Sequence, residues 1–393
     1  MPAHLSAEHL ARDLAVRDLS DPAAGPHALQ LVLGRAVDAL AERWGCQVRW
    51  WRGERTVTVE DNYDNLGYHP DDVTRDARYT RYVDDRHMLR SHSSALVPAA
   101  LRALAAEQGT EQAGGQEDVL LVCPGLVYRR DSIDRLHTGT PHQVDLWRLT
   151  RRPDRLTTAD LDEMVATLVG ALLPGAVHRH EARVHPYTLD GRQVDVDRQG
   201  EWIEVAECGL AHPEVLGRAG LGAEWSGLAL GMGLDRMLML LKGVPDIRIL
   251  RSSEPSVAAQ LTDLAPYRPV SVMPPVRRDL SVAVGREDLV EDLGDRVRDA
   301  LGPDADCVEA VEILSETPCE ELPPQALARL GARPDQKNVL LKVVLRHLER
   351  TLTDHEANLL RDRVLAAVHR GGVHQWAAAP IEAVPNRGES QRR

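Results

Sequence analysis

The sequence predicts an α+β protein in which a mostly antiparallel sheet flanked by helices precedes a smaller α/β sandwich. The chain has 393 residues, which at roughly 100–200 residues per domain predicts two domains. Strand-like segments between residues 118 and 206 follow one another too closely for parallel crossovers, which favours antiparallel pairing. Beyond residue 270 the pattern reads strand, strand, helix, strand, loop, strand, helix, an order typical of a ferredoxin-like sandwich.

The amino-acid composition argues for some classes of protein and against others. With 43% hydrophobic and 27% charged residues the chain is globular in composition. No apolar run approaches the ~20 residues of a membrane span, and the opening residues lack a signal-peptide core, so we expect a cytoplasmic protein with no membrane partner. The five cysteines are scattered, odd in number and form no CxxC pair, which argues against disulfide scaffolds and zinc ribbons. The net charge of −13 disfavours non-specific binding to polyanions.

In the first part of the chain, residues 27–44 have helical apolar spacing and follow the Pro26 turn. Two alternating runs, QVRWW and TVTVE, are separated by residues 52–54 and predict a hairpin. A helix over 158–172 opens with the capping box Thr157–Asp160. Another helix, over 234–242, follows two glycines. Further strands are predicted at 118–123, 125–131, 143–149, 192–196 and 201–206.

The later part predicts strands at 271–275, 278–284, 308–314 and 337–345, with helices at 289–301 and 354–368. We therefore expect four regions: a first domain over 1–255, a linker over 256–268, a second domain over 269–372 and a tail over 373–393.

Three sites carry charged side chains suited to chemistry. Arg129 lies on a predicted strand with acidic and histidine neighbours, where it can clamp a phosphoryl group or form part of a surface ion-pair ladder. Arg236 opens an apolar helix after GMG, and a cation there is costly unless it meets an anion. Glu204, in the strand WIEV, can hold a metal or simply be solvated. The chain contains no GK[ST], so any nucleotide must be held by arginines.

Together these motifs resemble those of a known family. GLVYRRDSIDRLHTGTPHQVD, WIEVAECGLAHPEVL and GLALGMGLDRMLMLLKGVPDIR are similar to motif 2, the following strand and motif 3 of phenylalanyl-tRNA synthetases, which are class II enzymes. LRSHSSALV resembles the family's LRTHTS segment, and DPAAGPHALQL its motif 1. MPPVRRDLSVAV and LERTLTDHEAN resemble the ferredoxin-fold anticodon-binding domain, fused here to the catalytic domain as in the single-chain organellar type.

The resemblance implies activation of an amino acid with ATP and Mg²⁺, and transfer of the acyl group to tRNA. It implies catalytic roles for Arg129 and Arg236, and a magnesium ligand in Glu204. The ATP-binding residues would be Arg129, His137, Pro141, Glu204 and Arg236. The amino-acid-binding residues would be His92, Ser94, Asp131, Gln143, Asp145, His185, Tyr187, Glu207, Ala229 and Gly231. The tRNA-binding residues would be Arg277, Arg278, Arg346 and Arg350.

Several positions depart from the family pattern. The family's Phe-Pro-Phe, whose rings flank the substrate ring, is His185-Pro186-Tyr187, and Glu207 replaces a glycine. The whole chain contains no phenylalanine, where roughly a dozen are expected. Either the pocket is rebuilt for a more polar amino acid, which we favour, or phenylalanine was removed because the protein is made when charged Phe-tRNA is scarce. The second explanation does not account for Glu207.

The acceptor and the assembly leave alternatives open. The chain can belong to a paralogue that activates an amino acid for a small molecule or carrier protein rather than for tRNA. The predicted second domain has no overall basic footprint, although a complete anticodon-type domain favours tRNA. We expect a monomer or a homodimer with no obligate beta subunit.

Overall fold

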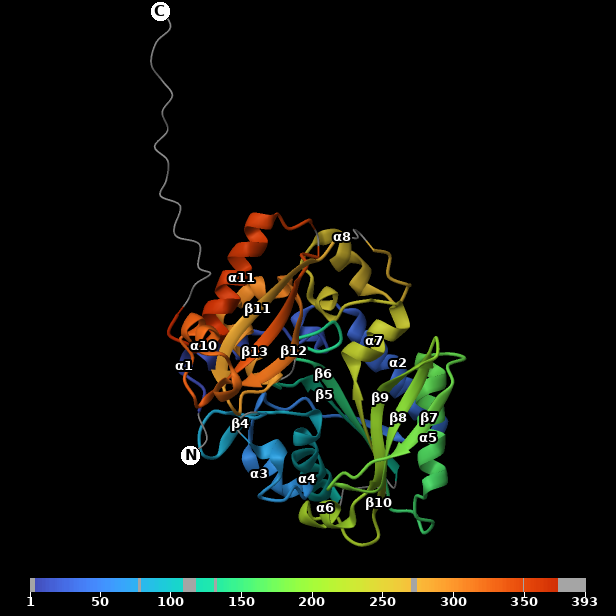
Figure 1. Ribbon diagram of the computed structural model, residues 1–393. Coiled ribbons are helices and arrows are strands. Elements are labelled where there is room, and N and C mark those ends of the chain that lie inside the picture. The colour runs from blue at the N-terminus through green and yellow to red at the C-terminus, as the bar shows by residue number, and fades with distance from the viewer. Residues whose placement is uncertain are drawn as a thin grey trace, which may run out of the picture. The chain divides into compact units, whose positions relative to one another are not determined.

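The computed structural model describes residues 4–76, 79–108, 118–130, 133–269, 274–348 and 350–373. The chain divides into two compact units, residues 1–131 with 135–270 and residues 132–134 with 271–393 (Figure 1). Among the described residues, no helix combines the length and apolar character that crossing a membrane requires.

The first unit is built on a seven-stranded sheet in the order β1-β5-β6-β10-β9-β8-β7 (Figure 1). Its strands are β1 Gln47–Trp50, β5 Asp118–Leu126, β6 His142–Thr150, β7 His178–Ala182, β8 Thr188–Arg198, β9 Glu201–Ala211 and β10 Ser226–Gly233. All neighbours pair antiparallel except β1 and β5. The predicted antiparallel sheet is therefore present.

The described part of the first unit also contains eight helices. They are α1 Ala7–Ala15, α2 Ala28–Trp44, α3 Val59–Asn62, α4 Val97–Gln108, α5 Thr158–Leu172, α6 Pro213–Arg218, α7 Leu234–Lys242 and α8 Pro255–Ala258. Helix α2 packs beside α5 and α7, whereas α4 and α6 share a core cluster with β5, β6 and β10. Every residue of β5 is buried, which explains its nearly continuous apolar sequence.

Capping residues and glycines in the sequence mark the ends of the predicted helices correctly. Thr157 and Asp160 form the expected capping box of α5. Helix α2 begins after His27 and ends at Gly45, and α7 ends at Gly243. Both glycines adopt positive φ, which terminates a helix at little cost. The helices predicted over 27–44, 158–172 and 234–242 are thus confirmed.

The predicted hairpin between QVRWW and TVTVE is wrong. Strand β1 pairs in parallel with β5, and β2 (Thr56–Thr58) joins a separate small sheet with β4 (His87–Leu89) and β3 (Arg81–Tyr82). Alternating residues specify a strand but not its partner. Between the two strands, a Cβ on Gly53 would lie 2.8 Å from Leu96 Cδ2, so a larger residue there would require the Leu96 side chain to move.

The strand predicted over 125–131 is also wrong, because β5 ends at Leu126. Pairing nevertheless continues irregularly beyond the two strand ends. The amide of Val127 donates to the Pro141 carbonyl and that of Arg129 to the Gly139 carbonyl, at 2.8 and 2.9 Å. This ladder fixes the backbone at Arg129. Residues 131 and 132 lie outside the described part of the chain.

The second unit contains a three-stranded antiparallel sheet in the order β11-β13-β12. Its elements are β11 Val276–Gly285, α9 Val290–Leu301, β12 Val308–Pro318, α10 Pro324–Leu330, β13 Gln336–Leu345 and α11 Asp354–Val368. Apolar residues of α9 and α11 share one core with the sheet. Most of the strand predicted at 271–275 lies outside the described residues.

Candidate active site

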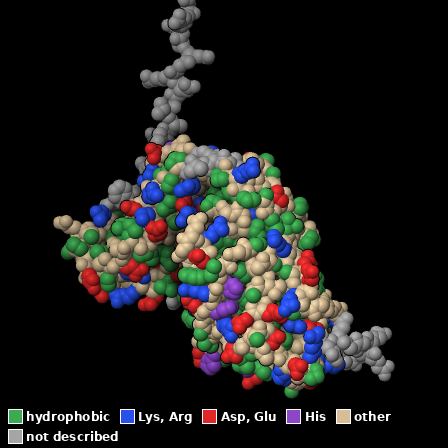
Figure 2. Space-filling model, turned by 90° about the vertical axis from the view of Figure 1, so that its right-hand side faces the viewer, with side chains coloured by type: hydrophobic (Ala, Val, Ile, Leu, Met, Phe, Trp, Pro, Cys, Tyr) green, Lys and Arg blue, Asp and Glu red, His purple; other side chains and the backbone are tan. Residues whose placement is uncertain are grey.

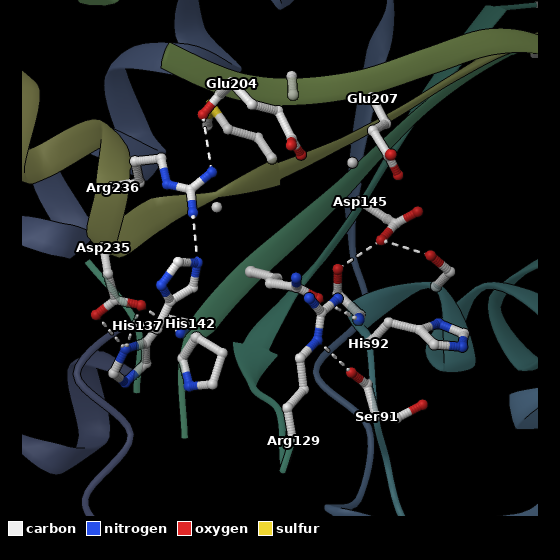
Figure 3. A pocket seen from close by; sticks show the side chains of 18 of the residues that line it. Ser91, His92, Arg129, His137, His142, Asp145, Glu204, Glu207, Asp235 and Arg236 are labelled. Atoms are coloured by element: carbon white, nitrogen blue, oxygen red, sulfur yellow. Dashed lines mark hydrogen bonds and ion pairs between the residues drawn. The ribbon is translucent and has the colours of Figure 1, made fainter. Parts of the chain in front are cut away.

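A cavity of about 620 Å³ in the first unit brings together most of the predicted site (Figure 3). Its walls come from the connection between β5 and β6, from β6, β9 and β10, and from the start of α7. Both Arg129 and Arg236 line it. The two guanidinium groups, far apart in the sequence, therefore face one space.

Arg129 is held at three points. Its Nε donates to the Ser91 carbonyl at 3.0 Å. Its backbone amide donates a hydrogen bond to the Gly139 carbonyl, and its backbone carbonyl accepts one from Arg81 Nη2 at 3.1 Å. A side chain fixed in this way is preorganised to bind an anion with little loss of entropy.

Arg236 lies in the first turn of α7, at the other end of the cavity from Asp145 (Figure 3). Its Nη1 donates to the Glu204 carbonyl at 3.0 Å, and its Nη2 lies 3.5 Å from His137 Nε2. The exposed Glu204 side chain lines the same cavity, as do His137 and Pro141. The structure thus groups all five residues predicted to bind ATP.

A buried pair beneath this end joins β6 to α7. The backbone amide of His142 donates to Asp235, and His142 Nδ1 lies 3.0 Å from Asp235 Oδ1. Burial opposes ionisation of Asp235, but the charge and hydrogen bonds of His142 hold the pKa of that carboxyl below its usual value. Asp235 thereby ties the turn that carries Arg236 to the central strand.

Asp145 occupies the opposite end of the cavity. Its carboxyl accepts from Ser93 Oγ, from Ser94 Oγ at 3.1 Å and from Trp147 Nε1 at 3.1 Å. Burial raises the pKa of Asp145 to about 6, against the effect of these hydrogen bonds. The side chain of Gln143 lies close by, where its Oε1 accepts from the Ser93 amide at 3.2 Å.

His92 lines the same end and stacks on Tyr68, with ring centroids 5.7 Å apart. Burial and the nearby charge of Arg129 lower the pKa of His92 to about 3. His92 is therefore an uncharged wall of the cavity at neutral pH, able to bond a ligand without repelling a cation.

The remaining predicted amino-acid-binding residues divide into three groups. Tyr187, Glu207 and Gly231 line the cavity. Ala229 and His185 are buried next to it, but neither lines it. Asp131 lies outside the described residues. The sequence interpretation did not include other residues that line the cavity, among them Tyr68, Ser91, Ser93, Arg183 and Asp235. Of these, Ser91 and Ser93 had a signal in the LRSHSSALV segment, and Asp235 had one as an acid beside Arg236 in an apolar helix.

The four arginines predicted to bind tRNA lie in the second unit, where three already have acidic partners. Arg278 donates to Asp354 at 3.1 Å, Arg350 pairs with Glu356 at 2.8 Å, and Arg346 pairs with Glu309. Arg277 is exposed on β11. On the face shown in Figure 2, Lys and Arg side chains alternate with Asp and Glu rather than forming one extended basic area, as far as the described residues show.

Among the described residues, no cluster of three or more His, Cys, Asp or Glu side chains is arranged to hold a metal ion. Glu204 supplies one carboxylate to the cavity. Mg²⁺ is commonly held by one or two carboxylates together with the phosphates of a nucleotide, and this donor set fits that mode.

An antiparallel sheet that presents one arginine from a strand connection and another from the following helix to a single cavity is the arrangement of class II aminoacyl-tRNA synthetases. Residues 23–261 match the family described as "tRNA synthetases class II core domain (F)", and the chain belongs to that family.

Curated relatives are similar over much of the chain. The Phenylalanine--tRNA ligase alpha subunit of Nostoc sp. is 30% identical over 64% of this chain and 71% of its own length. The probable mitochondrial phenylalanine--tRNA ligase of Drosophila melanogaster is 28% identical over 79% of this chain and 75% of its own. The chloroplastic/mitochondrial phenylalanine--tRNA ligase of Arabidopsis thaliana is 28% identical over 80% of this chain and 69% of its own length.

Proposed function

We propose that this chain is a phenylalanine–tRNA ligase-like enzyme that makes an aminoacyl-adenylate from ATP and transfers the acyl group to tRNA. The observation that supports it most is the placement of Arg129 and Arg236 on one cavity, within a chain of the class II synthetase family. The two organellar relatives match most of the chain, which favours a single-chain enzyme with no beta subunit.

In the proposed reaction the substrate carboxylate attacks the α-phosphorus of ATP in line, and pyrophosphate leaves. Negative charge builds on phosphate oxygens, so fixed cations are suitable catalysts and no nucleophilic side chain is required. Arg129 would bind the α-phosphate, while Arg236 and His137 would bind the outer phosphates. Glu204 would hold Mg²⁺, which supplies further charge neutralisation when bound.

The other end of the cavity would hold the amino acid. Asp145 would accept hydrogen bonds from the α-ammonium group, and Gln143, Ser94 and His92 would surround that group. Tyr187 and Tyr68 would face the side chain, since their rings lie 6.3 Å apart on the same wall. This arrangement brings the substrate carboxylate towards Arg129, between the two ends.

For the second unit we propose a ferredoxin-like anticodon-binding domain. Its antiparallel three-stranded sheet with α9 and α11 in one core supports this proposal. Contacts to tRNA would use Arg277 and, by exchange of an internal carboxylate for a phosphate, Arg278, Arg346 and Arg350.

Charging of tRNA tests the function directly. Purified protein is incubated with ATP, Mg²⁺, a labelled aromatic amino acid and tRNA-Phe, and acid-precipitable label is counted. We expect label on tRNA that base releases, because the product is an ester. Amino-acid-dependent ATP–pyrophosphate exchange without any charging of tRNA would instead support the paralogue that serves a small molecule or carrier protein.

The pH dependence of amino-acid binding tests the role of Asp145. Because the pKa of this carboxyl is raised to about 6, the group is ionised above that pH and protonated below it. The amino-acid KM is expected to rise by up to about tenfold per pH unit below pH 6, because a protonated carboxyl no longer attracts an ammonium group. The ATP KM should not follow the same curve.

The measurement is pyrophosphate exchange between about pH 5 and pH 8, run on the wild type and on Asp145→Asn. The variant should have a high amino-acid KM that no longer changes through pH 6. An amino-acid KM for the wild type that stays flat through this range would contradict the assigned role.

A further inference from the structure

The aromatic end of the cavity contains a carboxylate that the proposed reaction does not use. Glu207 lies on β9 opposite Gly231 of β10, so no neighbouring side chain on that strand covers it. Its side chain is 31% exposed and lines the cavity. Figure 3 shows its carboxylate on the same side of the cavity as Asp145.

Glu207 is held in place by two neighbours. His185 Nε2 lies 3.2 Å from Glu207 Oε2, and Arg183 Nε lies 3.4 Å from Oε1. His185 is itself fixed, since its Nδ1 lies 3.2 Å from Thr188 Oγ1 and its ring stacks on Tyr187 at 5.6 Å. The buried imidazole therefore orients Glu207, and does not line the cavity itself.

Glu207 is ionised at neutral pH. Burial alone would raise its pKa, but the neighbouring His185 and Arg183 hold that pKa below its usual value. A carboxylate has about four acceptor positions, and these two neighbours use only part of them. The rest are available to a ligand in the cavity.

Among the described residues, this end of the cavity thus offers two carboxyl groups, those of Asp145 and Glu207, whereas the backbone of an amino acid brings a single ammonium group. Asp145 matches that ammonium, and Glu207 is left for the side chain. An unsubstituted ring would displace water from Glu207 and give nothing in return, which is the situation that makes polar sites reject apolar analogues.

We propose that Glu207 selects an aromatic amino acid whose ring carries a hydrogen-bond donor, a hydroxyl or an amino group. This inference rests on the proposed function and names its substrate class. His185 and Arg183 act as positioning residues, and the aromatic wall of Tyr68 and Tyr187 retains the preference for a ring.

The test compares kcat/KM in ATP–pyrophosphate exchange for phenylalanine, tyrosine, 3-hydroxyphenylalanine and 4-aminophenylalanine. The wild type should activate at least one of the three donor-bearing amino acids about tenfold or more better than phenylalanine, as expected when a hydrogen bond to a charged group is gained. Glu207→Gly and Glu207→Gln should lose this preference by a similar factor, and their activity with phenylalanine should rise.

Glu201→Gln is the matched control, because Glu201 is an exposed residue of the same strand and does not line the cavity. It should leave every rate unchanged, and thermal melting checks that each variant folds. Phenylalanine as the best substrate of the wild type would overturn this inference alone. So would an equal loss for all four amino acids in Glu207→Gln, which would place the carboxylate on the ammonium group. No exchange with any amino acid would overturn the proposed function as well.

Discussion

Replacing Arg129 with alanine is expected to lower amino-acid-dependent ATP–pyrophosphate exchange by a factor of about 10³, comparable to the loss of a preorganised oxyanion donor elsewhere. The guanidinium is already oriented by Ser91, and its backbone by Gly139 and Arg81, so its charge meets the phosphate without reorganisation. The exchange rates are measured by quenching reactions with labelled pyrophosphate at successive times and counting the label in ATP.

Two further variants sharpen this prediction. Arg129→Lys keeps the charge but not the planar fork, and should recover only part of the activity. Arg218→Ala removes an exposed arginine that pairs with Glu214 on α6, and should have no effect on exchange. A loss of less than threefold or so in Arg129→Ala would contradict the assigned role, since even one charge-assisted hydrogen bond contributes more.

The largest effect on stability is expected from Asp235→Ala. His142 is completely buried, and the substitution leaves both its ring and its backbone amide without their acidic partner. Each of these two buried donors left unsatisfied costs about 1–3 kcal/mol, so the free energy of unfolding should fall by about 2–6 kcal/mol. Urea unfolding followed by circular dichroism measures it.

A buried pair elsewhere on β6 provides the control. Arg148 donates two hydrogen bonds to Asp118, at 3.0 and 2.8 Å, and its guanidinium lies over Trp44. Arg148→Ala should destabilise the protein by a similar amount but leave the KM for ATP unchanged in the folded fraction. Asp235→Ala should raise that KM, because it also releases the turn that carries Arg236. Equal stability of Asp235→Ala and wild type would show that the pair does not tie β6 to α7.

Local signals account for what the sequence predicts correctly. The capping box at Thr157 and the positive-φ glycines Gly45 and Gly243 mark helix ends through interactions a few residues apart. The partner of β1 depends instead on a strand about seventy residues later, and no short-range pattern specifies it. Strand β10 was missed for a similar reason, since its glycines hide the alternation expected of a strand.

Prediction of the site was limited in the same way, by contacts between residues far apart in the sequence. The two arginines could be proposed from their motifs, but their shared cavity follows from the adjacency of β5, β6 and β10, which only the resemblance suggested. His185 and Glu207 stood out in the sequence as separate departures. That they form one pair, with the carboxylate in the cavity and the imidazole behind it, depends on the register of β8 against β9 and could not be deduced from either residue alone.

Equilibrium titration of ATP with Mg²⁺ against the wild type, Arg129→Ala, Arg236→Ala and the double variant is the most direct test that both arginines hold one triphosphate. Each single variant is predicted to bind ATP about tenfold or more weakly, and the double variant more weakly still. Wild-type affinity for ATP in either single variant would show that the two guanidinium groups do not share a nucleotide, and would contradict the account.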